Sequence, residues 1–358
     1  MSAPAGWFAR FLLPGLAFKA VIIGGGYATG RELAEFFMPL GPWGGLAGMV
    51  TAAVLWSLVS VVTFLLAGRF GSRDYRSFFQ GLLGRGWFLF EICYLLLLVI
   101  ILAVFGAAAG AIGQALFGWP LLAGTLLLVS LIALFTAFGN HSVEALFKYV
   151  SILLYTVYAA FLILAISRFG GRISSAFADL DLVDGWIPAG LTYAGYNLIG
   201  AVAILPVLRH MTSPKDAVIA GLCTGPLAMA PAIVFFVCMA AWPDSASQLL
   251  PSDFLLGKLD MPPLRWLFQA MIFAALLESG SGVVHAVNQR LAGQGETLDW
   301  RWRLASSLTL LVGAVFVADH FGLVRLIANG YRLLAWSFLA VYALPLFTIG
   351  VWKLSKAR

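Results

Sequence analysis

The sequence predicts an all-α membrane protein with ten transmembrane helices, arranged as two inverted halves of five helices. Three observations lead to this fold class. Of the 358 residues, 61% are hydrophobic and only 11% are charged, whereas soluble domains carry about 25% charged residues. The mean hydropathy of +0.95 agrees. The apolar residues fall into ten runs, and glycines interrupt the first and the sixth of these runs.

Each of the ten runs approaches the length that a membrane helix needs, which is about 20 mostly apolar residues. We expect them at residues 11–37, 43–67, 87–116, 119–138, 144–167, 186–208, 216–241, 265–289, 302–318 and 323–350. Only residues 117–120 separate the third run from the fourth, and only residues 318–322 separate the ninth from the tenth. Both pairs should therefore be tight antiparallel hairpins. The whole chain, 1–358, should be one transmembrane domain, with repeats at about 11–167 and 186–350.

The placement of lysine and arginine predicts the orientation in the membrane. Most of the 22 basic residues lie on the side of the N-terminus. The opposite side holds Arg168, Arg172, Lys258 and Arg265, and several aspartates dilute their charge. Because basic residues accumulate in cytoplasmic loops, both termini should be cytoplasmic. The net charge of +6 then reports topology, and we expect the lipid bilayer, not nucleic acid, as a partner.

The first interruption is the stretch VIIGGGYATGRE at residues 21–32, with three consecutive glycines near the middle of the span. Such glycines weaken a helix, and unpaired backbone groups at membrane depth are tolerated only beside protein or a water-filled cavity. The stretch does not fit a dinucleotide-binding loop, since Thr29 occupies the position of the third glycine and no acidic residue occurs between Glu35 and Asp74. The interruption therefore predicts a cavity.

The second interruption is PAGLTYAGYNLIGA at residues 188–201, where glycines alternate with polar residues near the middle of the sixth span. One interpretation is a packing interface of small residues whose tyrosine hydroxyls bond to neighbouring helices. The other is a binding site, because interrupted segments at corresponding places in two halves are the best sequence indication of one in a transporter.

Ten spans in a five-plus-five inverted arrangement, with the first and sixth interrupted, resemble the LeuT-type fold of the amino acid–polyamine–organocation superfamily. More narrowly, GGGYATGRELAEFF in span one and ESGSGVVHAVNQR in span eight resemble the YkvI-type bacterial membrane proteins. The resemblance implies a secondary transporter of the bacterial cell (inner) membrane, not an enzyme, that moves an amino acid or related small molecule by alternating access. It would be driven by Na⁺ or H⁺ and work as a monomer or homodimer.

The resemblance also implies a substrate site. In LeuT-type transporters, the N-terminal end of the outer half of span one receives the substrate carboxylate, since free N–H groups and the helix dipole favour an anion there. Carried over to this sequence, the substrate-binding residues are Gly25, Gly26, Tyr27 and Ala28 from span one and Tyr193, Gly195, Tyr196 and Asn197 from span six. Glu278 of span eight would complete the site.

The driving ion is less determined. Sodium-coupled relatives use carbonyls of the span-one interruption and hydroxyls of span eight, which implies Ile23 and Gly24 with Ser279 or Ser281, and charge from Glu278. A possible Na⁺ ion is then the only cofactor expected. A proton carried on a buried Glu278 is the alternative.

Span eight carries a polar face, because Glu278, Ser281, His285 and Asn288 recur at helical spacing. Intramembrane charges usually face the bundle interior, so Glu278 is either functional or paired with a buried arginine. Near the first interruption, Arg31 and Glu32 either belong to an ion-paired cluster with Glu35 in the outer vestibule or reach Glu278 across the cavity and gate it.

Two other classes of protein remain open. A membrane-embedded enzyme would need clustered nucleophiles or metal ligands, and the sequence contains no HxxxH or HExxH motif. A sensor with a transporter fold is compatible with everything above.

Overall fold

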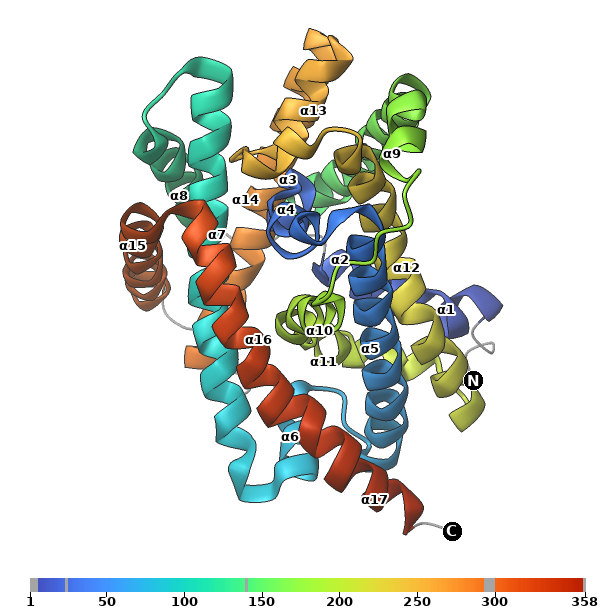
Figure 1. Cartoon of the computed structure of the whole chain (residues 1–358). Helices are drawn as coiled ribbons and strands as arrows, with labels where there is room; N and C mark the ends of the chain where they lie inside the picture. Colours follow the sequence, from blue (N-terminus) through green and yellow to red (C-terminus); the bar gives the residue numbers. More distant parts are fainter. Residues whose placement is uncertain (1–5, 23–24, 139–140, 293–299, 357–358) are drawn as a thin grey trace.

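The structure is a computed structural model that describes residues 6–22, 25–138, 141–292 and 300–356 (Figure 1). Every regular element within these ranges is helical. This agrees with the expected all-α class. Six helical segments of the described chain are long and apolar enough to cross a membrane, and two shorter apolar helices accompany them.

The helices follow the apolar runs closely. In the first half they are α1 (Trp7–Phe11), α2 (Leu13–Ile22), α3 (Gly25–Thr29), α4 (Arg31–Phe36), η1 (Met38–Leu40), α5 (Gly41–Phe70), α6 (Tyr75–Leu83), η2 (Gly84–Gly86), α7 (Trp87–Phe117), α8 (Leu121–Phe138) and α9 (His141–Ala176). In the second half they are α10 (Trp186–Asn197), α11 (Ile199–Ala203), η3 (Leu205–His210), α12 (Pro214–Ala240), η4 (Pro243–Ser247), α13 (Pro251–Leu259), α14 (Pro262–Ala292), α15 (Trp300–Arg325), η5 (Leu326–Tyr331), α16 (Arg332–Phe338), η6 (Leu339–Ala343), η7 (Leu346–Gly350) and α17 (Val351–Ser355). Figure 1 shows α13 at one end of the molecule and α6 and α17 at the opposite end.

Both expected hairpins turn at a glycine. α7 ends at Gly118, whose φ of 69° lies in the left-handed region that favours glycine. Gly124 on α8 then lies so close to α7 that a Cβ there would come within 2.5 Å of the carbonyl oxygen of Ala109. The ninth and tenth spans join at Gly322, where φ is 70° and ψ is 165° inside an otherwise helical segment.

The helices α5 and α12 lie side by side and come from opposite halves of the chain (Figure 1). A Cβ at Gly225 would lie 1.9 Å from the carbonyl oxygen of Ala53, so the two backbones are in contact. Pro226 lacks an N–H and therefore leaves the carbonyl of Leu222 without its helical partner. The hydroxyl of Ser57 donates to that carbonyl at 3.0 Å and accepts from the N–H of Gly225 at 3.2 Å. Ser57 thus compensates for the proline within α12.

The helix α6 packs against the protein. Asp74 is its N-cap and accepts a bond from the N–H of Ser77. Its aromatic side chains Phe78 and Phe79 are fully buried, and Leu82 is almost so. Phe79 stacks on a ring of α7 at 3.6 Å between centroids. The apolar face of α6 is therefore directed into the core, and not, as an interfacial helix would have it, into the bilayer.

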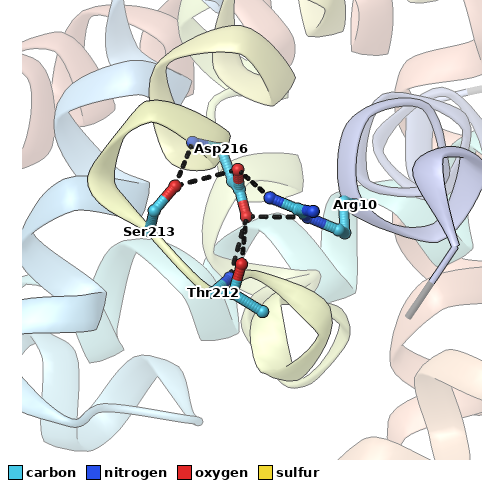
Figure 2. Close-up of polar contacts among 4 residues, drawn as sticks. All are labelled: Arg10, Thr212, Ser213 and Asp216. Atoms are coloured by element: carbon cyan, nitrogen blue, oxygen red, sulfur yellow. Dashed lines mark hydrogen bonds and ion pairs between the residues drawn. The ribbon is translucent and has the colours of Figure 1, made fainter. Parts of the chain in front are cut away.

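A polar cluster joins the start of the first span to the start of α12 (Figure 2). Asp216 lies in the first turn of α12 and accepts bonds from the backbone and hydroxyl of Thr212 and from the hydroxyl of Ser213. Arg10 of α1 donates to both carboxylate oxygens, at 3.0 and 2.7 Å. Hydrogen bonding to Asp216 raises the pKa of the Arg10 guanidinium, so the pair stays ionised. The cluster fixes α1 to α12.

Candidate functional site

Around the first expected interruption, the described residues form separate short helices. α2 ends at Ile22, and Gly30 separates α3 from α4 with a φ of 78°. A Cβ at Gly30 would also lie 2.7 Å from the ring of Phe235, so both the conformation and the surroundings require glycine. The interruption places Arg31 and Glu32 in the first turn of α4, where both are buried.

At the second expected interruption, Asn197 ends α10 and Ile199 begins α11. The side-chain amide of Asn197 donates to the carbonyl of Tyr193 at 3.0 Å. A Cβ at Gly195 would come within 2.7 Å of the carbonyl oxygen of Ala335 on α16. This glycine therefore lets α10 pack directly against α16.

A cavity of about 330 Å³ lies between the segments of the two expected interruptions. Its wall is formed by the end of α2, the start of α4, the first half of α7, the α10–α11 junction, α14 and η5. Most of the wall is apolar. The polar residues that line it are Glu32, Tyr94, Tyr196, Asn197, Ser279 and Tyr331. Since α7 begins beside α6, the cavity extends from the middle of the molecule toward the α6 end.

Glu32 is the only charged side chain among the described residues that line this cavity. It is 5% exposed, and its Oε2 accepts a hydrogen bond of 2.7 Å from the hydroxyl of Tyr196. Tyr196 stacks in turn on Tyr331, with 4.4 Å between ring centroids. A buried carboxylate is costly unless a proton or a positive charge compensates it. The cavity is therefore suited to a cation or a proton at Glu32.

Arg31, the neighbour of Glu32, attaches α4 to the chain between α12 and α13. The guanidinium of Arg31 donates to the carbonyls of Ala246 and Gln248 at 2.7 and 2.8 Å. It also pairs with Glu35 at 3.2 Å, so the expected ion pair between these two residues is confirmed. These contacts attach α4 to the segment that follows α12. Arg31 and Glu32 thus have separate partners, and a contact of either with Glu278 stays a prediction.

The expected substrate-binding residues form two groups in the structure: some line the cavity, and the others do not. Tyr196 and Asn197 line the cavity. Tyr27, Ala28 and Tyr193 are buried in the core around it, at 0%, 2% and 0% exposure. Gly25 and Gly26 begin α3, and Gly195 contacts α16 as described above. Their roles in binding a substrate stay predictions.

The expected ion-coupling residues are distributed differently. Ser279 lines the cavity, whereas Glu278 is half-buried and is not among the residues that line it. The hydroxyl of Ser281 is buried without a hydrogen-bond partner among the described residues. Ile23 and Gly24 lie outside the described residues. Across the described part of the chain, no three His, Cys, Asp or Glu side chains come together as metal ligands. A bound Na⁺ therefore stays a prediction.

Sequence reasoning did not assign two of the cavity residues, Tyr94 and Tyr331, to the site. Tyr94 lies on span three among leucines and isoleucines. Its hydroxyl within this apolar run is the feature that could have indicated a position on the cavity wall. Tyr331 lies in the π-helical segment η5, whose turn does not follow the ordinary helical period. Glu32 was expected as a gate, and the structure places it on the cavity wall.

The comparison with known sequences agrees with the resemblance seen in the two motifs. The chain is 25% identical over 207 residues to the uncharacterized membrane protein YkvI of Bacillus subtilis (strain 168). This match covers 56% of the chain and 58% of YkvI, so it spans little more than half of either protein. No protein-family model matches the chain.

The comparison with solved structures shows the fold. The manganese transporter of Eremococcus coleocola superposes with a TM-score of 0.60 at 17% identity, over 97% of this chain and 81% of that one. A Na⁺-coupled sialic acid symporter gives 0.61 at 14% identity, over 94% and 78%. MhsT, solved with L-phenylalanine, gives 0.55 at 18% identity, over 98% and 89%. These neighbours are transporters, not enzymes. The chain is thus similar in sequence to YkvI and has the LeuT-type fold of these membrane transporters.

Proposed function

We propose that this protein is a cation-coupled secondary transporter that moves a small organic solute by alternating access around the cavity at Glu32. The solute is an amino acid or a related compound. The observation that carries the proposal is the buried carboxylate of Glu32 on the wall of an otherwise largely apolar cavity, where it is the one charged group among the described lining residues. The similarity in fold to transporters supports it.

The proposal includes the finer architecture. Ten spans form two inverted repeats, at about 11–167 and 186–350, within one domain of the bacterial inner membrane. Both termini and the α6 end are cytoplasmic. We propose that the conformation is inward-facing, with the cavity directed toward that end and Arg31 attaching α4 to η4 near the opposite one.

Within the cavity, the carboxylate of Glu32 binds a positively charged group. The carboxylate of the solute binds to the backbone N–H groups of Gly25, Gly26, Tyr27 and Ala28, because the N-terminus of a helix favours an anion. Ser279 contributes to the site of the coupling cation, and Glu278 supports it from the neighbouring face of α14.

The first experiment is a thermal-shift screen of the purified protein against amino acids, amines and small organic acids, with and without Na⁺ and at several pH values. We expect one compound class to stabilise the protein. Compounds that do so are then tested for uptake into proteoliposomes under a Na⁺ or a proton gradient. If no compound stabilises the protein under any ion condition, the proposal is wrong.

The variant Glu32→Gln locates the site. It removes the charge while keeping the shape of the side chain, so we expect a loss of at least tenfold in gradient-driven uptake. Glu35→Gln is the matched control, because it removes a carboxylate one helical turn away that pairs with Arg31 outside the cavity. Uptake that is equal in the two variants would exclude Glu32 as the charged group of the site. Glu278→Gln, measured alongside, tests the role predicted for span eight.

A further inference from the structure

A second and larger cavity lies at the α6 end, away from Glu32. Its volume is about 650 Å³, and it is bounded by the end of α5, by residues 205–217 and by Leu354 of α17. Three arginines line it: Arg69 and Arg73 from the end of α5 and the turn after it, and Arg209 from η3. All three are exposed. The cavity therefore has a solvent-accessible basic rim, and the end of α5, the turn after it and η3 each contribute one arginine to this rim.

The positive charge of this rim is not neutralised by the described residues. No ion pair forms between any of the three arginines and a described carboxylate. Asp216 lies beside the rim residues Thr212 and Ser213, but its two oxygens are occupied by these residues and by Arg10 (Figure 2).

The other nearby acid is occupied as well. Asp74 follows Arg73 in the sequence, and its carboxylate accepts bonds from the N–H and the hydroxyl of Ser77 at the start of α6. Arg69 is held in place, because it donates to the main-chain carbonyl of Lys353. The rim therefore presents guanidinium groups whose charge is available to an anion.

Part of the cavity wall is apolar. Beside the arginines and a few hydroxyl side chains, the wall contains Phe64, Leu65, Leu205, Leu208 and Leu354. A free inorganic anion would gain nothing from this apolar wall. A phospholipid matches both parts, because its phosphate carries negative charge and the first methylene groups of its acyl chains are apolar.

We propose that this cavity binds the phosphate headgroup of an anionic phospholipid. Basic pockets between membrane helices on the cytoplasmic side are suited to such headgroups, and the predicted orientation places the α6 end on that side. Since α6 directs its own apolar face into the core, the arginines near it are the groups that contact the membrane surface. A bound lipid would join α5, η3 and α17. The proposal does not depend on transport, because none of these residues lines the cavity at Glu32.

The test is lipid binding to the purified, delipidated full chain, followed by thermal shift and by native mass spectrometry. The probes are phosphatidylglycerol, phosphatidylcholine and inorganic phosphate. We expect saturable stabilisation and a retained lipid with phosphatidylglycerol, and at least tenfold weaker effects with the other two. An equal effect of inorganic phosphate would overturn the assignment to a lipid, and an equal effect of phosphatidylcholine would overturn the role of headgroup charge.

Two triple variants of equal charge locate the site. The first carries Arg69→Gln, Arg73→Gln and Arg209→Gln. The second carries Arg85→Gln, Lys215→Gln and Lys356→Gln, which are exposed and line neither cavity. The first should weaken phosphatidylglycerol binding at least tenfold and the second less than twofold. Equal losses would show a diffuse surface attraction and contradict the proposal. Arg209→Gln alone, at an exposed position of η3, provides a milder variant with an expected loss of about fivefold.

Discussion

The first span is fastened by one arginine at each end, and the two arginines have different kinds of partner. Arg10 donates to both oxygens of Asp216, which belongs to the first turn of the long helix α12. Arg31 donates mainly to two main-chain carbonyls, those of Ala246 and Gln248, in the segment between α12 and α13. One attachment joins charge to charge on a long α-helix, and the other joins charge to neutral carbonyls of η4 and of the residue after it.

This difference indicates which end of the span can be released. A bidentate pair between guanidinium and carboxylate is stronger and more directional than bonds to neutral carbonyls. Asp216 is further held by Thr212 and Ser213. We therefore expect α1 and α2 to move together with α12, and the contact of Arg31 to be the one that opens when the cavity becomes accessible from the α13 end.

The largest effect should come from Asp216→Ala. This change removes the partner of Arg10 and also the acceptor of the Thr212 N–H at the start of α12. We expect the amides of residues 212–217 to exchange about a hundredfold faster, because several bonds to a charged group are lost together. Hydrogen exchange with mass spectrometry measures this. Asp216→Asn is the control, since it keeps a hydrogen-bond acceptor. If Asp216→Asn exchanges as slowly as the unmodified protein, the charge of Asp216 does not contribute.

An intermediate effect is expected from Arg31→Gln. The shorter, neutral side chain loses the bonds to Ala246 and Gln248, so the amides of residues 243–248 should exchange about tenfold faster. The start of α12 should remain unchanged. Glu35→Gln leaves the carbonyl contacts in place. At the same amides, it should increase the logarithm of the exchange rate by less than half as much as Arg31→Gln does. Faster exchange at residues 212–217 in Arg31→Gln would contradict the independence of the two attachments.

The smallest effect is expected from Arg10→Lys. Lysine keeps the charge but cannot donate to both carboxylate oxygens in the planar geometry of arginine. Exchange of residues 212–217 should increase by about two- to threefold. A change as large as that of Asp216→Ala would show that geometry, and not charge, accounts for the attachment.

Much of the fold follows from the sequence, because hydropathy and glycine placement act locally. The runs at 43–67 and 87–116 correspond to α5 and α7 within a few residues. The short links at residues 117–120 and 318–322 correspond to turns with left-handed glycines. Such features depend on neighbouring residues alone, so a single sequence contains them.

The orientation of individual side chains could not be predicted in the same way. Consecutive residues of a helix point about 100° apart. An error of one residue in the predicted rotation of the helix therefore exchanges Glu278 and Ser279 at the cavity. The face that contains Asn288 is indeed polar, because Asn288 bonds to Ser306 and Ser307 on α15. The left-handed Gly30 likewise changes the direction of the chain before Glu32, and no helical period extends across it.

The contact of Ser57 with Leu222 has a consequence for biosynthesis. α5 leaves the ribosome well before α12, so Ser57 enters the bilayer before its partners Leu222 and Gly225 have been made. The nascent α12, for its part, carries a carbonyl freed by Pro226 until Ser57 reaches it. Each helix satisfies a polar group that the other exposes to lipid. The two halves of the chain are therefore best regarded as a single folding unit that matures only after α12 has been inserted.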